Sequence, residues 1–124
     1  MSKKILVVDD SRLSRMIIKT LLSDKRPDWE IKDVANADEA LKLVEQESFD
    51  GVTLDVNMPG KDGLTLGKEL REKLPQAALI IITANIQDSV RDTALEYGLN
   101  FITKPLNEEK FQPVFGMIEN HPAN

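Results

Sequence analysis

Four short apolar runs in this chain each lead directly into residues that are common in phosphoryl chemistry. The runs are residues 5–8, 51–54, 79–82 and 101–103, and they lead into Asp9 and Asp10, Asp55, Thr83, and Lys104 with Pro105, respectively. Runs of this length that are rich in Val and Ile and lack alternation are typical of buried parallel strands. The carboxyl ends of such strands meet at one edge of a sheet, where open α/β folds bind ligands. The pattern therefore predicts both a fold class and the place of a functional site.

Segments with helical periodicity separate the apolar runs. Ser11 is the expected N-cap of the first helix, and Asn36, with Glu39 at the third helical position, is the expected N-cap of the second. Further helices are expected over about residues 64–73 and 87–97, the latter stopped by Gly98, and a fifth is expected to begin at Asn107. The first helix is expected to carry an apolar stripe of Leu13, Met16, Ile17 and Leu21, with Thr20 at its margin.

A weaker strand over residues 30–34 completes an alternation of five strands with five helices. Such alternation indicates an α/β fold, in which a doubly wound parallel sheet carries helices on both faces through right-handed crossovers. A chain of 124 residues is long enough for one hydrophobic core, and the sequence contains no linker or repeat. We therefore expect one domain over residues 1–124.

Pro113 interrupts the expected last helix. Counted from an N-cap at Asn107 it occupies the sixth helical position, where proline removes a hydrogen bond and costs about 3 kcal/mol. Gly116 weakens the same segment further. Two alternatives follow: the helix kinks at Pro113, or a first turn ends and a short helix restarts with Pro113 near its first position.

Charge and cysteine content exclude several functions. The formal net charge is −5 and the basic runs are no longer than two residues, which argues against direct binding of nucleic acid or anionic membrane. The absence of cysteine excludes disulfides and thiolate chemistry, and no segment is long enough for a signal h-region or a membrane span. We expect a cytoplasmic protein with a frayed terminus over residues 120–124, in which His121 has no role.

The acidic strand ends predict a magnesium site. Taken alone, Asp9 and Asp10 would be helix-capping acids and Asp55 a turn residue. In a flavodoxin-like order, however, the first and third strands are neighbours at the switch point, so these acids meet. Mg²⁺ prefers carboxylate, carbonyl and water oxygens. We expect direct ligation by Asp10 and Asp55, contact with Asp9 through water, and ligation by the Asn57 backbone carbonyl.

Thr83 and Lys104 extend this hypothesis. A strand threonine commonly satisfies nearby backbone, and a lysine is commonly a solvated surface charge. Lys104, however, follows a buried run and precedes Pro105, which holds its backbone extended and directs the ammonium along the sheet edge. There it would meet a phosphoryl group.

The whole chain resembles the receiver domains of two-component response regulators. The matching motifs are residues 7–11, 54–63, 82–84 and 103–105, which cover nearly the whole chain in the family's order. The resemblance implies a flavodoxin-like five-stranded sheet in the order 2-1-3-4-5. It further implies that Asp55 accepts a phosphoryl group from a kinase phosphohistidine with Mg²⁺ bound, and that the peptide bond between Lys104 and Pro105 is cis.

The resemblance also implies how a signal leaves the site. Lys104 would pair with the phosphoryl group while Thr83 moves to hydrogen-bond it. The switch aromatic is Phe101, where the family frequently has tyrosine, so burial of the ring replaces any signal through a hydroxyl. The face formed by the fourth helix, the fifth strand and the fifth helix would then bind a downstream protein.

The expected function is that of a chemotaxis-type regulator that is phosphorylated rather than a turnover enzyme. Its partners would be a sensor histidine kinase or phosphotransfer protein and a downstream target. The chain could instead be a receiver cut from a longer regulator with an output domain, or a degenerate receiver that serves only as a scaffold. A rival from another class is a haloacid-dehalogenase-type phosphatase. That class needs an acid two residues after its nucleophile, where this chain has Asn57 after Asp55 and Ser11 after Asp9.

Overall fold

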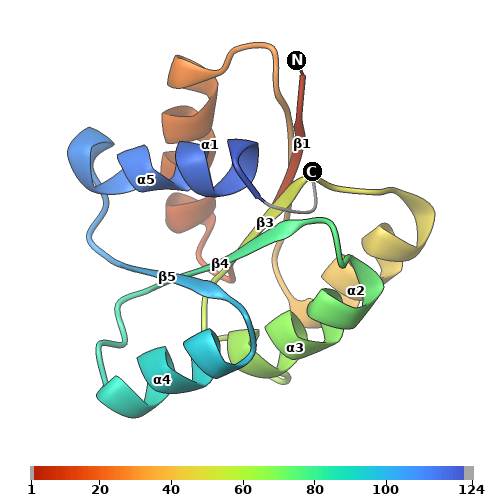
Figure 1. The fold of residues 1–124 in the computed structure, drawn as a ribbon, viewed down its shortest axis with the longest axis vertical. Helices are drawn as coiled ribbons and strands as arrows, with labels where there is room; N and C mark the ends of the chain where they lie inside the picture. The colour runs from red at the N-terminus through yellow and green to blue at the C-terminus, as the bar shows by residue number, and fades with distance from the viewer. Residues whose placement is uncertain (1, 122–124) are drawn as a thin grey trace.

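Five parallel strands form a single sheet in the order β2-β1-β3-β4-β5 (Figure 1). The computed structural model describes residues 2–121. The strands are β1 (Lys4–Val8), β2 (Glu30–Val34), β3 (Gly51–Leu54), β4 (Ala78–Thr83) and β5 (Asn100–Thr103). The helices are α1 (Arg12–Lys25), α2 (Ala37–Gln46), α3 (Gly63–Lys73), α4 (Asp88–Glu96) and α5 (Glu108–Glu119). The predicted doubly wound α/β fold and its strand order are confirmed.

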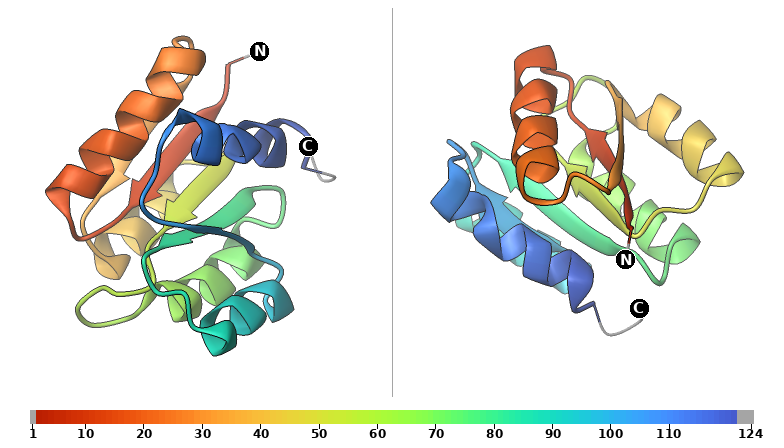
Figure 2. Two further views of the ribbon diagram at one scale, coloured as in Figure 1. Left: turned by 90° about the vertical axis from the view of Figure 1, so that its left-hand side faces the viewer. Right: turned by 90° about the horizontal axis from the view of Figure 1, so that it is seen from above.

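The helices cover both faces of the sheet. Helices α1 and α5 lie on one face, and α2, α3 and α4 lie on the other (Figures 1 and 2). The first layer buries Ile18, Leu22, Phe111, Val114, Phe115 and Ile118 against the sheet. The second buries Ala37, Ala40, Leu66, Leu70, Val90 and Ala94. Because β1, β3 and β4 are covered on both sides, their sequences read as continuous apolar runs.

The helix ends follow the capping signals of the sequence. The side chains of Ser11, Asn36 and Asn107 accept hydrogen bonds from the backbone three residues further on, at 3.2, 2.9 and 2.7 Å. Gly98 follows α4 with φ of +77°, a conformation that glycine adopts at little cost. These local signals set the starts of α1, α2 and α5 and the end of α4.

The apolar stripe predicted for α1 does not face the core. The helix buries Ile18 and Leu22, while Leu13, Met16 and Ile17 are 66%, 56% and 41% exposed. Within the predicted stripe Leu21 packs against the core, and Thr20 is exposed. The sequence of α1 offers apolar residues on more than one face, so periodicity alone could not choose between them. The result is an apolar surface on α1 that the described chain leaves uncovered.

Helix α5 continues through Pro113, so the predicted alternative of a helix that restarts there is wrong. Pro113 cannot donate to the Glu109 carbonyl, but both residues are exposed, and water can reach that carbonyl. The buried side chains of α5 lie on the opposite side of the helix and include Phe111 and Phe115, whose rings pack edge to face with centroids 5.6 Å apart. Packing against the sheet thus outweighs the local cost of the proline.

Two further expectations concern the C-terminal residues and membrane-spanning segments. The expected frayed terminus over residues 120–124 falls mainly on residues 122–124, which lie outside the described residues. Among residues 2–121, none of the helices combines the length and the apolar character that crossing a bilayer requires.

Candidate functional site

Three carboxylates from the ends of β1 and β3 meet at the carboxyl edge of the sheet. Asp9 and Asp10 follow β1, Asp55 follows β3, and one oxygen atom from each lies within 4.8 Å of the others. The Asp55 N–H donates to the Val8 carbonyl at 3.1 Å, which holds the two strand ends level. Asp9 and Asp55 are buried, whereas Asp10 is exposed. The structure therefore gathers the three acids that the strand-end pattern singled out.

Backbone N–H groups orient two of these carboxylates. The Ser11 N–H donates to Asp9 Oδ1 at 2.9 Å, and the Asn57 N–H donates to Asp55 Oδ1 at 3.3 Å. Each bond spans two residues and closes a local turn, so the carboxylates are fixed by the chain that carries them. Ser11 also caps α1, and one short segment therefore both begins the helix and orients Asp9. The Asn57 backbone carbonyl remains a predicted metal ligand.

Gly63, the first residue of α3, packs directly on the backbone of Asp55. A Cβ at this position would lie 1.9 Å from the Asp55 carbonyl oxygen, far inside van der Waals contact. The Gly63 N–H also donates to the Val56 carbonyl at 3.0 Å. Any side chain here would push α3 away from Asp55. Sequence reasoning missed this role, although a glycine directly after the α3 N-cap Asp62 is a usable signal.

Lys104 places its ammonium between the acids. Lys104 Nζ donates to Asp9 Oδ2 at 2.9 Å, to Ser14 Oγ at 3.1 Å and to Asp55 Oδ2 at 3.2 Å. The peptide bond from Lys104 to Pro105 is cis, the isomer that the family resemblance implies. The Lys104 N–H donates to the Thr83 carbonyl at 2.8 Å, which fixes the lysine backbone just beyond the ends of β4 and β5. Ser14 was not predicted, although it lies one helical turn beyond Asp10.

Burial and charge act on the protonation of this cluster in opposite ways. Burial raises the pKa of Asp9 above its usual value, against the lowering effects of the Ser11 N–H and the Lys104 ammonium. Burial by itself would lower the pKa of Lys104, but its hydrogen bonds and charge interactions with Asp9 and Asp55 raise it overall. Lys104 is therefore a fixed positive charge at neutral pH, whereas burial disfavours the ionised form of Asp9.

Thr83 and Phe101 lie near the site but make no recorded bond to the acids in residues 2–121. Thr83 is fully buried at the end of β4, and its hydroxyl accepts from the Asn85 N–H at 3.2 Å. This is the local backbone bond that an ordinary strand threonine would make. Phe101 on β5 is half-buried and packs against the core layer of α2, α3 and α4. Their predicted roles in switching are not visible in this conformation.

The acidic cluster fits a divalent cation. With all three acids ionised, one ammonium leaves two formal negative charges uncompensated among oxygens within 4.8 Å of one another. Hard oxygen donors in a partly open site are what Mg²⁺ prefers, because it retains several of its waters. Exposed Asp10 provides the open side. The donor set thus suits Mg²⁺ better than a thiolate- or imidazole-seeking metal, since the described site contains neither ligand type.

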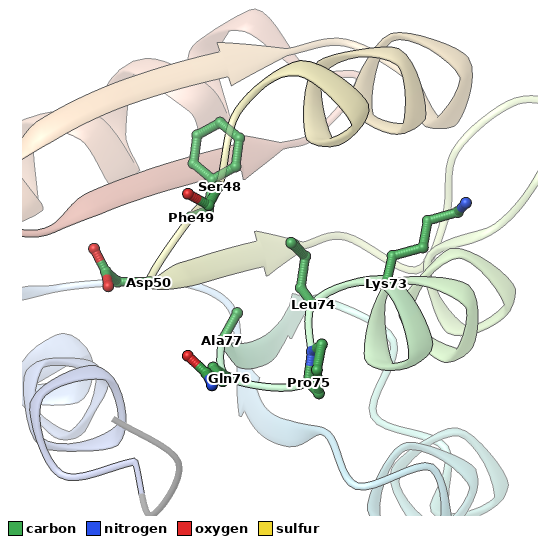
Figure 3. A pocket seen from close by; sticks show the side chains of 8 residues that line it. All are labelled: Ser48, Phe49, Asp50, Lys73, Leu74, Pro75, Gln76 and Ala77. Atoms are coloured by element: carbon green, nitrogen blue, oxygen red, sulfur yellow. The ribbon is translucent and has the colours of Figure 1, made fainter.

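Two cavities lie at opposite ends of the sheet. One of about 400 Å³ opens beside the acids and is lined by Ser14, Ile17, Ala84, Lys104, Pro105 and Leu106. The other, of about 310 Å³, lies at the amino end of β3 and is lined by Ser48, Phe49, Asp50, Lys73, Leu74, Pro75, Gln76 and Ala77 (Figure 3). Only the first adjoins the acidic cluster, and it provides an approach to Lys104.

Comparisons with known proteins assign the family. The response regulator receiver domain family matches residues 5–114. The chemotaxis protein CheY of Bacillus subtilis is 34% identical over 111 residues, which cover 89% of this chain and 92% of that protein. The solved structure of chemotaxis protein CheY4 of Vibrio cholerae has a TM-score of 0.84 and 25% identity, covering 95% of this chain and 99% of that one. The chain therefore belongs to the response regulator receiver family and is similar to chemotaxis-type members.

Other relatives carry a receiver within a longer chain. Protein-glutamate methylesterase/protein-glutamine glutaminase of Archaeoglobus fulgidus is 38% identical over 106 residues, which cover 82% of this chain but 30% of that protein. The enzymatic activity in that name belongs to that protein. The family match also decides between the two classes suggested by the sequence, in favour of a receiver over a haloacid-dehalogenase-type phosphatase.

Proposed function

We propose that Asp55 is the phosphoacceptor of a response regulator and that it takes its phosphoryl group from a phosphohistidine of a sensor histidine kinase or phosphotransfer protein. One observation carries the assignment: Asp55, directly after the central strand β3, is grouped with two further acids and is also 3.2 Å from the Lys104 ammonium. Asp10 lacks a recorded contact with Lys104 among the described residues, and Asp9 is 1% exposed. Asp55 is thus the acid best placed for both metal and lysine.

The proposed reaction is a phosphoryl transfer. A carboxylate oxygen of Asp55 forms a bond to phosphorus while the bond from phosphorus to the histidine nitrogen breaks, and the electron pair leaves with the imidazole. Lys104 lies where negative charge gathers on the phosphoryl oxygens, and a prepositioned ammonium stabilises that charge. The position two residues after Asp55 is Asn57, which cannot protonate a leaving group as a turnover phosphatase requires. We therefore propose self-catalysed phosphorylation and dephosphorylation in a regulatory role.

The same proposal assigns Mg²⁺ to the acidic cluster. Asp10 and Asp55 would bind it directly, Asp9 through water, and Asn57 through its backbone carbonyl. When bound, Mg²⁺ supplies positive charge to the acids and to the transferring phosphoryl group. The close grouping of the three carboxylates supports this ligand set.

Switching would begin at Thr83. Phosphoryl oxygens on Asp55 would draw the Thr83 hydroxyl inward, and a hydrogen bond to a charged group contributes about 1.5 to 3 kcal/mol. That energy can shift a two-state balance by roughly ten- to a hundredfold. The present bond from the Asn85 N–H is local and replaceable, and half-buried Phe101 has room to become more buried. Both facts support the proposed coupling.

Exposed apolar side chains in two regions, around α4 and on α1, support two kinds of partner. Ile86, just before α4, and Leu95 within α4 are 72% and 57% exposed, which supports binding of a downstream target at the face of α4, β5 and α5. Leu13 and Ile17 on α1 are exposed beside the cavity that leads to Lys104. An apolar surface beside the entrance to the site favours docking of the phosphodonor over α1.

Phosphorylation with a small donor tests the assignment. Acetyl phosphate with Mg²⁺ should add one phosphoryl group, detected by intact-protein mass spectrometry and located at Asp55 by peptide mapping. Asp55→Asn should remain unmodified. The matched control is Asp50→Asn at the other end of β3, which should be modified like the wild type. Efficient modification of Asp55→Asn at another side chain would contradict the proposal.

A further inference from the structure

The ammonium of Lys104 has a third partner that belongs to neither the metal nor the phosphoryl chemistry. A lysine ammonium carries three N–H donors. Two of them meet Asp9 and Asp55, and the third meets Ser14 Oγ at 3.1 Å. Ser14 is the only neutral acceptor of the three, and it comes from α1.

Ser14 is held in place by the start of its helix. Its backbone N–H donates to the hydroxyl of the N-cap Ser11 at 3.2 Å. Further along the helix, Ile18 and Leu22 are buried and anchor α1 on the sheet. The Ser14 hydroxyl is therefore presented by a packed helix, which positions a functional group better than a loop does.

We propose that Ser14 is a positioning residue whose hydroxyl keeps the Lys104 ammonium at the mouth of the site during phosphoryl transfer. This inference rests on the proposed phosphoacceptor role of Asp55. During the reaction Asp55 would become an acyl phosphate and Asp9 would contact a bound cation through water, so both carboxylates would change their relation to Lys104. The Ser14 hydroxyl has no such competing role, and it remains available to the ammonium throughout.

The cavity beside the site shows where Lys104 would go without this contact. Ser14 and Lys104 both line the opening of about 400 Å³, whose other lining residues include Ile17 and Leu106. A lysine side chain has four flexible methylene groups and a compact charge. Without the hydroxyl, the ammonium can turn into the open cavity and towards water. A smaller fraction of molecules then has Lys104 in place when the donor arrives.

Rates of Asp55 phosphorylation by acetyl phosphate at saturating Mg²⁺ provide the first test. Ser14→Ala should lower the rate about fivefold, the order of effect expected from loosening one charged group in a reacting site. Ser14→Thr retains a hydroxyl and should keep most of the rate. Valine has nearly the same shape as threonine but no hydroxyl, so Ser14→Val should resemble Ser14→Ala. Ser23→Ala removes an exposed serine from the same helix and serves as the matched control, with a rate equal to that of the wild type.

The second readout does not depend on activity. In metal-free protein, ¹⁵N NMR should show a distinct, slowly exchanging ammonium signal for Lys104, assigned by its loss in Lys104→Arg. The signal should broaden or disappear in Ser14→Ala and Ser14→Val but persist in Ser14→Thr. A purely structural role of Ser14 would leave the ammonium signal unchanged.

Equal rates and equal ammonium signals in wild type and Ser14→Ala would overturn the role of Ser14 while leaving the phosphoacceptor proposal standing. A wild-type protein that acetyl phosphate does not modify at Asp55 would overturn the proposed function, and this inference with it.

Discussion

Asp50 lies immediately before strand β3 and Asp55 immediately after it, and their hydrogen-bonding and charge environments differ. Asp50 Oδ2 accepts from the Lys4 N–H at 2.8 Å, and the Asp50 N–H donates to the Lys4 carbonyl at 2.8 Å. Asp55 shares its site with two other carboxylates and one ammonium. The first aspartate is satisfied by its neighbours, whereas the second belongs to a cluster with excess negative charge.

The same difference holds for the two edges of the sheet. At the amino edge Glu47 is paired with both Lys4 and Lys32, and Arg71 donates to backbone carbonyls of the turns that precede β4 and β5, including those of Leu74 and Gly98. The cavity at that edge is lined by residues that include Asp50 and Leu74 (Figure 3). A cavity alone therefore does not mark the functional edge. The functional edge is marked by buried charge that the protein leaves uncompensated. Such charge lowers stability and is retained where a ligand makes use of it.

The largest effect on stability is expected at the amino edge. Arg71→Ala should lower the free energy of unfolding by about 2 to 3 kcal/mol, because it removes charged hydrogen bonds to the part-buried carbonyls of Leu74 and Ala77. Chemical denaturation measures this, with the exposed Lys42→Ala as a control that should change stability by less than about 0.5 kcal/mol. Stabilisation by Mg²⁺ should be the same in Arg71→Ala as in the wild type. If Mg²⁺ no longer stabilised Arg71→Ala, the two edges of the sheet would not be independent.

A smaller effect is expected in the middle of β3. The Thr53 hydroxyl is buried and has no hydrogen-bond partner among the described residues. Thr53→Val has nearly the same shape and should raise the free energy of unfolding by about 1 kcal/mol, because it removes an unsatisfied polar group. Thr65→Val, on the exposed side of α3, is the control. A destabilised Thr53→Val would show that the hydroxyl is satisfied in solution.

The smallest effect on stability is expected for Asp33, near the carboxyl end of β2, which forms ion pairs with Arg15 and Lys19. Burial alone would raise the pKa of Asp33, but hydrogen bonds and charge from Lys19 and Arg15 lower it overall. An acid with a lowered folded pKa stabilises the fold above its unfolded pKa, about 3.9, and this contribution is lost as the pH falls through the folded value. Asp33→Asn should therefore cost about 0.5 to 1 kcal/mol at pH 7.

The cost of Asp33→Asn should shrink towards zero as the pH falls below about 4. Unfolding curves at several pH values measure it, with exposed Asp24→Asn as the control. A cost independent of pH would mean that packing, and not the ion pairs, holds Asp33.

The parts of the fold that sequence predicted are those set by local signals. The strands follow from short apolar runs, and Ser11, Asn36 and Asn107 mark helix starts by side-chain capping. The buried face of α1 and the continuity of α5 depend on packing between elements. Helix propensity and periodicity do not contain that information, so the α1 stripe was predicted wrongly, and of the two alternatives for Pro113 the restart is the wrong one.

The site residues also fall into those that local sequence signals predict and those that depend on packing. The acids and Lys104 could be predicted because each ends an apolar run, and parallel strands bring such ends together. Ser14 could not, because its place in the site depends on a 3.1 Å contact with Lys104. Gly63 carries a local signal in its position after the N-cap Asp62, but its close approach to the Asp55 backbone depends on packing. The first contact joins residues 90 positions apart in the sequence, and the second brings the start of α3 back onto the end of β3. Sequence patterns give the elements, while such distances require the packed structure.

The unfolding free energy of Asp10→Asn in metal-free buffer, compared with that of Asp50→Asn, shows whether excess negative charge gathers at the carboxyl edge. If the carboxyl edge holds excess negative charge, Asp10→Asn should be more stable than the wild type by about 1 kcal/mol and should lose its response to Mg²⁺. Asp50→Asn should be less stable by about 1 kcal/mol and keep that response. A metal-free Asp10→Asn that is less stable than the wild type would show that the carboxyl edge holds no destabilising excess of negative charge.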